Sequence, residues 1–188
     1  MKTIKSALFT VVALLALTSV SSAAGLNGVY LEASANAVGA IAEGNSNDAE
    51  SQTTTGAVGK TAISASYGLG FMTDRSKGMG VDFGYAMTPG QAKISHTSDS
   101  ATATNVSLDI DSMNELYIAP MINMTEDASV YFKYGWNSTD LTVVGDVNKI
   151  NSMDGNTVAL GTIMSWGSNL YLRTEAGQTE YDTLKFTG

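Results

Sequence analysis

The sequence contains no cysteine, and it has two prolines and one histidine among 188 residues. The missing cysteines exclude a disulfide framework, a thiol nucleophile and a cysteine-ligated metal site. Basic residues are also scarce, with ten Lys and Arg against eighteen Asp and Glu. Because phosphate binding requires positive charge, this balance argues against a nucleic-acid partner. No segment has clear apolar periodicity at helical spacing, so the glycine-rich chain is predicted to form strands separated by turns.

The first 24 residues have the pattern of an export signal. Lys2 and Lys5 precede the apolar run "ALFTVVALLALTSV", and "SSAA" supplies small residues for cleavage. The alternative is a retained membrane anchor, but the run is shorter than the ~20 residues that a spanning helix needs. We therefore expect a signal peptide at 1–24 and a mature domain at 25–188. Its eight basic and eighteen acidic residues give it a net charge of 8 − 18 = −10. Export without disulfides fits a bacterial envelope protein.

The segment "SVYFKYGWNS" shows the alternation that recurs along the mature chain. Val130, Phe132, Tyr134 and Trp136 share one face, and Lys133 lies on the other. Six more segments alternate in this way, which makes seven predicted strands. They are "NGVYLEASANAV", "KTAISASYGLGF", "MGVDFGYAM", "LDIDSMNELYIAPMI", "TVALGTIMSW" and "LYLRTEAGQ".

The connections between these strands alternate in length. Long polar connections are expected at Glu43–Gly56, Thr88–Asn105 and Thr139–Asn156, and short turns at "TDRSKG", "NMTEDA" and "GSN". This order is typical of an up-and-down barrel, in which all short turns lie at one end and all long loops at the other. We expect the long loops outside the cell.

The charged residues in the central part of each strand all lie opposite the large apolar residues. They are Glu32, Lys60, Asp82, Glu115, Lys133, Arg173 and Glu175. Their face is otherwise rich in Gly, Ala and Ser, as a narrow barrel interior requires. Four acids and three bases nearly balance, so we expect a paired structural plug rather than a conducting path.

The apolar face is expected to contact lipid, with aromatic residues near the membrane interfaces. The predicted lipid-facing residues are Phe71, Phe83, Tyr85, Phe132, Tyr134, Trp136 and Trp166. A soluble lipocalin-like barrel or a sandwich also buries one face of each strand, so the alternation leaves that alternative open.

Three segments carry a resemblance to a known group: "GVYLEASA", "ELYIAPMINMTEDASVYFKYGWNSTDL" and "LYLRTEAGQTEYDTL". The chain resembles the small bacterial outer-membrane β-barrel proteins of the OmpA transmembrane-domain, OmpX and opacity-protein type. The resemblance implies an all-β, antiparallel, up-and-down transmembrane barrel of the eight-stranded type, with short periplasmic turns and mobile external loops. Only seven strands are found before the final "LKFTG", so we expect a missing closing strand and a truncated chain. The first and seventh strands should then lie apart, or pair under strain.

Enzymatic chemistry has little support in the sequence. His96 lies beside Ser95 and near Asp99, but triad partners are assembled in space rather than within five residues. Asp109 and Asp111 could touch a cation, yet they do not make a coordination set. We expect no enzyme activity, no cofactor and no metal.

The sequence therefore predicts a monomeric structural or adhesive surface protein in the outer membrane. Its partners would be outer-membrane lipid and an unknown ligand of the loops. The alternatives are a narrow porin and a soluble binder of apolar ligands.

Overall fold

The computed structural model describes residues 2–3, 19–20, 27–47, 53–96, 106–144, 151–166, 170–182 and 185–186. For the two-residue strands, and for 38, 40–47, 53–62, 91–96, 106–109 and 143–144, it describes the backbone only. The described residues form strands and turns and no helix, so the predicted all-β class is confirmed. None of them belongs to a helix long and apolar enough to cross a membrane.

Seven long strands make up most of the described chain. They are β3 (Gly28–Asn47), β4 (Thr53–Met72), β5 (Met79–His96), β6 (Val106–Asn123), β7 (Ala128–Val144), β8 (Ser152–Trp166) and β9 (Leu170–Tyr181). Three two-residue strands accompany them: β1 (Lys2–Thr3), β2 (Ser19–Val20) and β10 (Lys185–Phe186).

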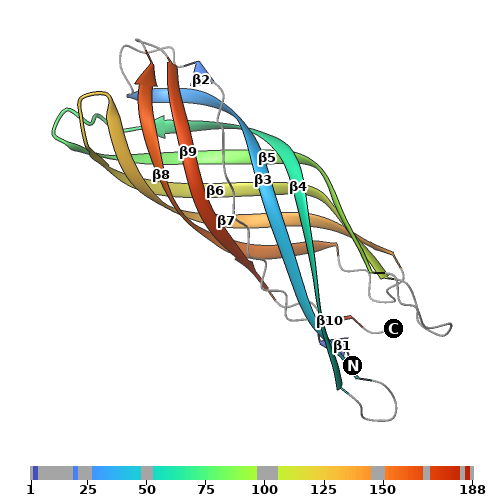
Figure 1. Cartoon of the computed structure of the whole chain (residues 1–188). Helices are drawn as coiled ribbons and strands as arrows, with labels where there is room; N and C mark the ends of the chain where they lie inside the picture. Colours follow the sequence, from blue (N-terminus) through green and yellow to red (C-terminus); the bar gives the residue numbers. More distant parts are fainter. Residues whose placement is uncertain are drawn as a thin grey trace.

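The seven long strands form one curled sheet in sequence order, and each is antiparallel to the one before it. Figure 1 shows this sheet as a half-barrel of tilted strands. Strands β3 and β9 are not neighbours in the sheet, which confirms the expected separation of the first and seventh strands. The residues described near the C-terminus do not close it, because β10 pairs with β1.

The strands are longer than the sequence predicted. Much of each expected long loop belongs to a hairpin ladder, which continues to Asn47↔Thr53, His96↔Val106 and Asp140↔Ser152. His96 therefore ends a strand and does not lie in a loop. The polar composition of these segments predicted loops, but a strand that extends beyond its large apolar residues can carry polar side chains on both faces. The β-branched residues of "TTTGAV" and "LTVV" favour this extension. The turn "GSN" lies outside the described residues.

Two neighbouring strands separate towards the loop end of the sheet. Strands β4 and β5 pair only between Tyr67–Met72 and Met87–Asp82, although both continue beyond this region. In Figure 1 the β3–β4 hairpin bends away from β5, β6 and β7 at that end. Gly90 lies where β5 deviates from regular pairing, and its φ of 137° is one that other residues rarely adopt.

A β-bulge in β6 corrects the predicted orientation of residues near its loop end. The pairing with β7 shifts between Ile110↔Leu141 and Ser112↔Asp140, so Asp111 is the extra residue. One inserted residue moves the side chains before it to the other face. Ile110, expected outside, is therefore buried, whereas Asp111, expected inside, is exposed and accepts a hydrogen bond from Thr142 Oγ1 at 2.6 Å.

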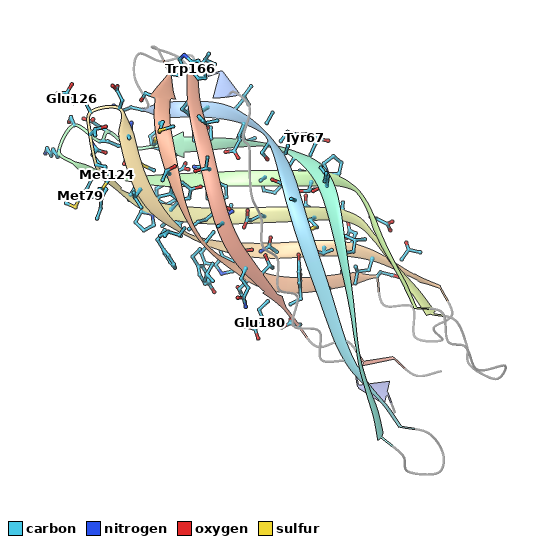
Figure 2. All side chains as sticks on the ribbon, viewed as in Figure 1. Tyr67, Met79, Met124, Glu126, Trp166 and Glu180 are labelled. Carbon is cyan, nitrogen blue, oxygen red and sulfur yellow. The ribbon has the colours of Figure 1, made fainter. Side chains whose placement is uncertain are left out.

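The two faces of the sheet differ in polarity. The concave face holds a core cluster of Tyr30, Met72, Tyr117, Ala119, Met121, Tyr131, Ile163 and Tyr171. The convex face carries exposed large apolar side chains, among them Tyr67, Met79 and Trp166 in Figure 2. The exposed large apolar residues thus lie on the outside of the half-barrel, and the buried tyrosines, methionines and Ile163 of the core cluster lie inside.

Candidate functional site: the charged interior of the half-barrel

Strand alternation brings charged side chains from five strands to the concave face. They are Glu32 of β3, Asp82 of β5, Glu115 of β6, Lys133 of β7, and Arg173 and Glu175 of β9. These are six of the seven predicted interior charges. The seventh, Lys60, pairs with Ala40 in the β3–β4 ladder, but its side chain lies outside the described residues.

Arg173 is the centre of the first ion-pair cluster. Its guanidinium lies 3.0 Å from Glu32 Oε2 and also pairs with Asp82, and it donates to Tyr117 Oη at 2.8 Å. Arg173 is 2 % exposed and Asp82 is 0 % exposed, so both groups depend on these partners for their solvation. Because Glu32 belongs to β3, this cluster connects the first and seventh long strands across the open side of the sheet.

Three tyrosines complete the surroundings of Arg173. Tyr30 Oη donates to Asp82 Oδ1 at 2.7 Å and lies 2.7 Å from Tyr117 Oη. The guanidinium lies 4.9 Å from the Tyr131 ring centroid and 5.5 Å from that of Tyr117, within the range of cation–π attraction.

Lys133 is the centre of the second cluster. Its ammonium lies 2.9 Å from Glu115 Oε2 and 2.5 Å from Glu175 Oε1. Tyr131 Oη donates to the other oxygen of Glu175 at 2.8 Å. The Tyr117 ring lies between the two clusters, with its centroid 5.3 Å from Lys133 Nζ. The two clusters therefore form one layer, which we call the charged layer.

Four carboxylates and two cations make up the charged layer. Its formal charge is negative, and Tyr30 and Tyr131 supply the extra donors that the carboxylates need. Charge-assisted hydrogen bonds of this kind are stronger than neutral ones. Every one of the six charges has a partner of opposite charge. The charged layer therefore has the ion pairs expected of a structural plug.

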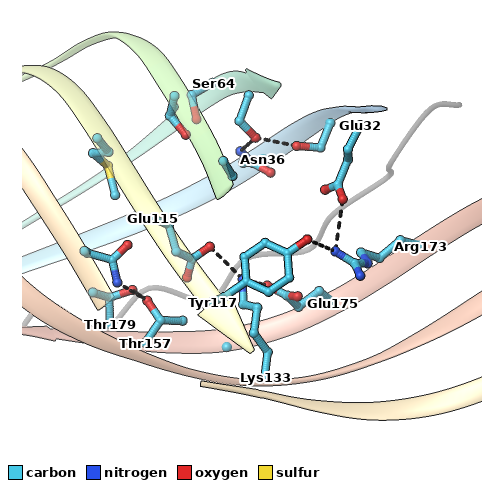
Figure 3. A pocket seen from close by; sticks show the side chains of 17 residues that line it. Glu32, Asn36, Ser64, Glu115, Tyr117, Lys133, Thr157, Arg173, Glu175 and Thr179 are labelled. Atoms are coloured by element: carbon cyan, nitrogen blue, oxygen red, sulfur yellow. Dashed lines mark hydrogen bonds and ion pairs between the residues drawn. The ribbon is translucent and has the colours of Figure 1, made fainter. Parts of the chain in front are cut away.

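A polar chamber lies on the loop side of the charged layer. The cavity has a volume of about 100 Å³, and Lys133, Glu115 and Glu175 contribute to its lining (Figure 3). Hydroxyl and amide groups line much of the rest, beside Ala86, Met113 and Gly177. Several of these polar groups bond to one another: Asn36 Nδ2 to Ser66 Oγ at 2.9 Å, Asn137 Nδ2 to Thr157 Oγ1 at 2.7 Å, and Thr157 Oγ1 with Thr179 Oγ1 at 2.6 Å. Such a lining suits water or a small polar solute.

An apolar plug, which the sequence analysis did not identify, fills the turn side of the charged layer. Met72, Met121 and Ile163 are each at most 2 % exposed. Arg75 of the β4–β5 turn folds inward and donates to Ser129 Oγ, and its carbonyl accepts from Asn123 Nδ2 at 2.9 Å. The sequence analysis made no prediction for Arg75, whereas the alternation of β6 and β8 does place Met121 and Ile163 on the inward face.

The seven residues predicted to face lipid lie on the convex side. Trp166 is the most exposed at 75 %, and Phe71, Phe83, Tyr85, Phe132 and Trp136 are also exposed. Tyr134 is half-buried because its ring packs edge-to-face on Trp136 at 5.0 Å. Two of these rings point a hydroxyl at an amide: Tyr85 Oη donates to Asn114 at 2.7 Å and Tyr134 Oη to Asn156 at 3.1 Å. Each ring therefore combines an apolar body with a polar, hydrogen-bonded tip.

The residues considered for catalysis or metal binding do not assemble into a site. The side chains of His96 and Asp109 lie outside those described, and Asp111 is exposed with Thr142 as its partner. Within the described part of the chain, no three acidic or histidine side chains come together as metal ligands.

In comparisons with known proteins, no family model, curated protein or solved structure matches this chain.

Proposed function

We propose that this protein is a small outer-membrane β-barrel with a structural role, which anchors acidic hairpins at the bacterial surface. The observation that carries the proposal is the inverted polarity of the half-barrel. Large apolar residues such as Leu160 and Ile122, each 60 % exposed, cover the outside. Arg173, Lys133 and four carboxylates meet inside. A protein that folds in water does not usually expose so large an apolar surface.

The height of the apolar surface supports a membrane location. On β5 the outward residues from Met79 to Met87 are apolar or aromatic, and on β8 those from Val158 to Trp166 are apolar or aromatic except Thr162; each segment is nine residues long. At ~3.3 Å per residue and a tilt near 40°, such a segment spans roughly 23 Å. This agrees with the ~25 Å apolar band of outer-membrane barrels. Beyond this band the exposed residues of β7 are Ser138, Asp140 and Thr142, which suit the aqueous surface.

The packed interior supports a structural role over transport. A solute crossing the interior would have to separate Lys133 from Glu115 and Glu175, and then displace Met72, Met121 and Ile163. Separation of a buried ion pair leaves uncompensated charges and is costly. The chamber is therefore a blind pocket in this proposal, and a narrow porin is the less favoured alternative.

Quenching of the two native tryptophans by brominated lipids tests the membrane location. The variants Trp136→Phe and Trp166→Phe leave one tryptophan each, at opposite ends of the apolar band. In vesicles of brominated phosphatidylcholine, we expect both variants to be quenched, and more strongly by bromines near the headgroups than by bromines near the bilayer centre. Unquenched fluorescence, with the protein recovered in the aqueous phase after centrifugation, would refute the membrane location.

Conductance in planar bilayers separates the structural role from a porin. We expect no discrete current steps from the inserted protein, because the charged layer and the apolar plug block the interior. Regular steps that scale with salt concentration would favour the narrow porin and would leave the membrane location intact.

A further inference from the structure

The charged layer below the polar chamber holds more negative than positive charge. Four carboxylates face Arg173 and Lys133, so the formal charge of the described side chains is 2 − 4 = −2. Lys60, whose side chain lies outside those described, adds at most one positive charge. The excess therefore stays negative, and uncompensated charge in a protein interior is costly.

Two of the four carboxylates keep one oxygen for a further partner. Asp82 and Glu175 each use both oxygens in hydrogen bonds and ion pairs. Glu32 and Glu115 line the chamber, and within the described part of the chain each pairs through Oε2 alone. Their side chains are 13 % and 17 % exposed, against 0 % and 9 % for Asp82 and Glu175. The floor of the chamber therefore offers two carboxylate oxygens as acceptors.

Glu32 and Glu115 lie at one level of the sheet. Glu32 is paired with Gly68, Gly68 with Ala86, and Ala86 with Glu115. The two residues between the carboxylates are therefore among the smallest available, and they leave room for the chamber between the two acids.

A second pair of polar residues lines the wall of the chamber towards the loop end. Asn36 and Ser64 are directly paired on β3 and β4. Asn36 Oδ1 and Ser64 Oγ are buried and have no hydrogen-bond partner among the described residues. A third such atom, Arg173 Nε, belongs to a guanidinium that two carboxylates already hold. Because a buried polar atom without a partner is costly, Asn36 and Ser64 point to a ligand that supplies hydrogen bonds.

The two sets of acceptors are close enough for one small ligand. Asn36 Nδ2 donates to Ser66 Oγ at 2.9 Å, and Ser66 is paired with Ser34, two residues from Glu32. The Asn36 amide is thus drawn to within about 7 Å of strand from the level of Glu32. A cavity of ~150 Å³ can hold benzene, so the chamber of about 100 Å³ suits about four non-hydrogen atoms. A chain of that size can form a hydrogen bond at each end.

We infer that the polar chamber binds a small protonated amine with a hydroxyl group two carbons away. The ammonium group lies at Glu32 and Glu115, where it supplies positive charge and N–H donors to the free carboxylate oxygens. The hydroxyl group lies at Asn36 and Ser64, where it donates to Asn36 Oδ1 and accepts from Ser64 Oγ. A metal ion suits the chamber less well, because no three acidic or histidine side chains come together in the part of the chain that the structure describes.

Three compounds of four non-hydrogen atoms test the two ends of the site separately. Protonated ethanolamine carries both groups, propylamine replaces the hydroxyl by a methyl, and ethylene glycol replaces the ammonium by a hydroxyl. Binding to the full chain in nonionic detergent micelles is measured by calorimetric titration at neutral pH and constant ionic strength. We expect ethanolamine to bind about tenfold more tightly than either other compound, because each replacement removes a charge or a hydrogen bond.

Two variants assign each end of the ligand to its residues. Ser64→Ala removes a hydroxyl without a partner in the described fold, so it should leave propylamine binding unchanged and reduce the preference for ethanolamine to about threefold or less. Glu32→Gln should weaken both amines by about tenfold and leave their ratio unchanged. Ser138→Ala, exposed on β7, is the matched control and should change neither affinity.

Three outcomes would overturn the inference. They are no binding of ethanolamine, equal binding of the three compounds, and an ethanolamine-to-propylamine ratio that is the same in Ser64→Ala as in the native chain. Because the titration takes place in micelles, any of these results would leave the proposed membrane location standing.

Discussion

At the scale of single residues, the interior depends on tyrosines that lie over glycines. Tyr30 is paired directly with Gly70, Tyr117 with Gly84, and Tyr131 with Gly161. A Cβ atom on any of these glycines would lie 2.3 Å from the Cζ atom of its tyrosine. The glycines thus provide the space in which each ring lies flat along the wall, with its hydroxyl directed to the charged layer. Aromatic cover of a cross-strand glycine also stabilises strand pairing.

Gly84→Ala should destabilise the fold by displacing Tyr117. The ring cannot move freely, because its hydroxyl is bound to both Tyr30 and Arg173. We expect a loss of about 1 to 3 kcal/mol in the free energy of unfolding, measured by urea titration in micelles. Ala86→Ser, on the same face of β5 where the chamber leaves room, is the matched control and should change little. An unchanged midpoint for Gly84→Ala would show that the ring is not held in place.

Lys133→Met should be among the most damaging single changes, because it leaves Glu115 and Glu175 buried without their cation. Removal of one partner of a buried ion pair typically costs about 3 to 5 kcal/mol. The triple variant Lys133→Met, Glu115→Gln, Glu175→Gln removes every charge of this cluster and should recover most of the loss. A triple variant no more stable than Lys133→Met, by the same titration, would argue against pairing as the role of these residues.

Asp74 in the short β4–β5 turn should make stability depend on pH in the acid range. Its carboxylate accepts from the backbone N–H of Ser76 at 2.8 Å and from the Ser76 hydroxyl at 2.8 Å, and these bonds hold the pKa of Asp74 below its ordinary value of 3.8. A lowered pKa in the folded state stabilises the fold above the ordinary value, and this contribution is lost as the pH falls through the folded-state value. Asp74→Asn should therefore be less stable than the native chain at neutral pH, and the two unfolding midpoints should converge below pH 3.8. A difference that stays constant through the acid range would contradict this role.

At the scale of elements, the outward face of β7 changes from apolar to polar along the strand. On β7 the outward residues are apolar or aromatic from Val130 to Trp136, and Ser138 and Asp140 follow. The bulge at Asp111 in β6 lies level with this change, opposite Asp140 and Leu141. It turns Ile110 inward, where this side chain is buried rather than exposed above the band. The end of the apolar band is thus built into both strands.

Phe132→Arg tests where that band lies on β7. A charge on the lipid face near the midplane should cost about 2 to 4 kcal/mol in the free energy of unfolding, measured in phospholipid vesicles. Ser138→Arg, three outward positions along the same strand, lies beyond the band and should cost less than about 1 kcal/mol. Equal costs at 132 and 138 would contradict the assigned position of the band.

At the scale of the whole molecule, the inverted polarity was predictable from the sequence and the internal contacts were not. A period of two assigns each side chain to a face, so Glu32, Asp82, Lys133 and Arg173 could be placed inside. The same period does not reveal which charges meet, and Arg173 and Asp82 are 91 residues apart. The inward fold of Arg75 likewise has no periodic signal, because it lies in a turn.

The strand ends and the bulge were missed for other reasons. A bulge adds one residue without changing composition, so nothing in "LDIDSMN" marks Asp111 as the extra position. The strand extensions of "TTTGAV" and "LTVV" were read as loops because polarity was given more weight than β-branching. Greater weight on the Thr and Val residues would have predicted longer strands at β4 and β7. The seven-strand order, in contrast, followed directly from the turns.

A nitroxide scan along β8 tests whether the apolar face, and not the opposite face, contacts lipid. Single cysteines from Asn156 to Met164, with Gly161 left unchanged, are spin-labelled in the protein in phospholipid vesicles, and the accessibility of each label to molecular oxygen is measured. Oxygen concentrates in the bilayer, so we predict a period of two with maxima at Val158, Leu160, Thr162 and Met164 and minima at Thr157, Ala159 and Ile163. Accessibility without alternation, or with maxima at the inward positions, would contradict lipid contact by the apolar face.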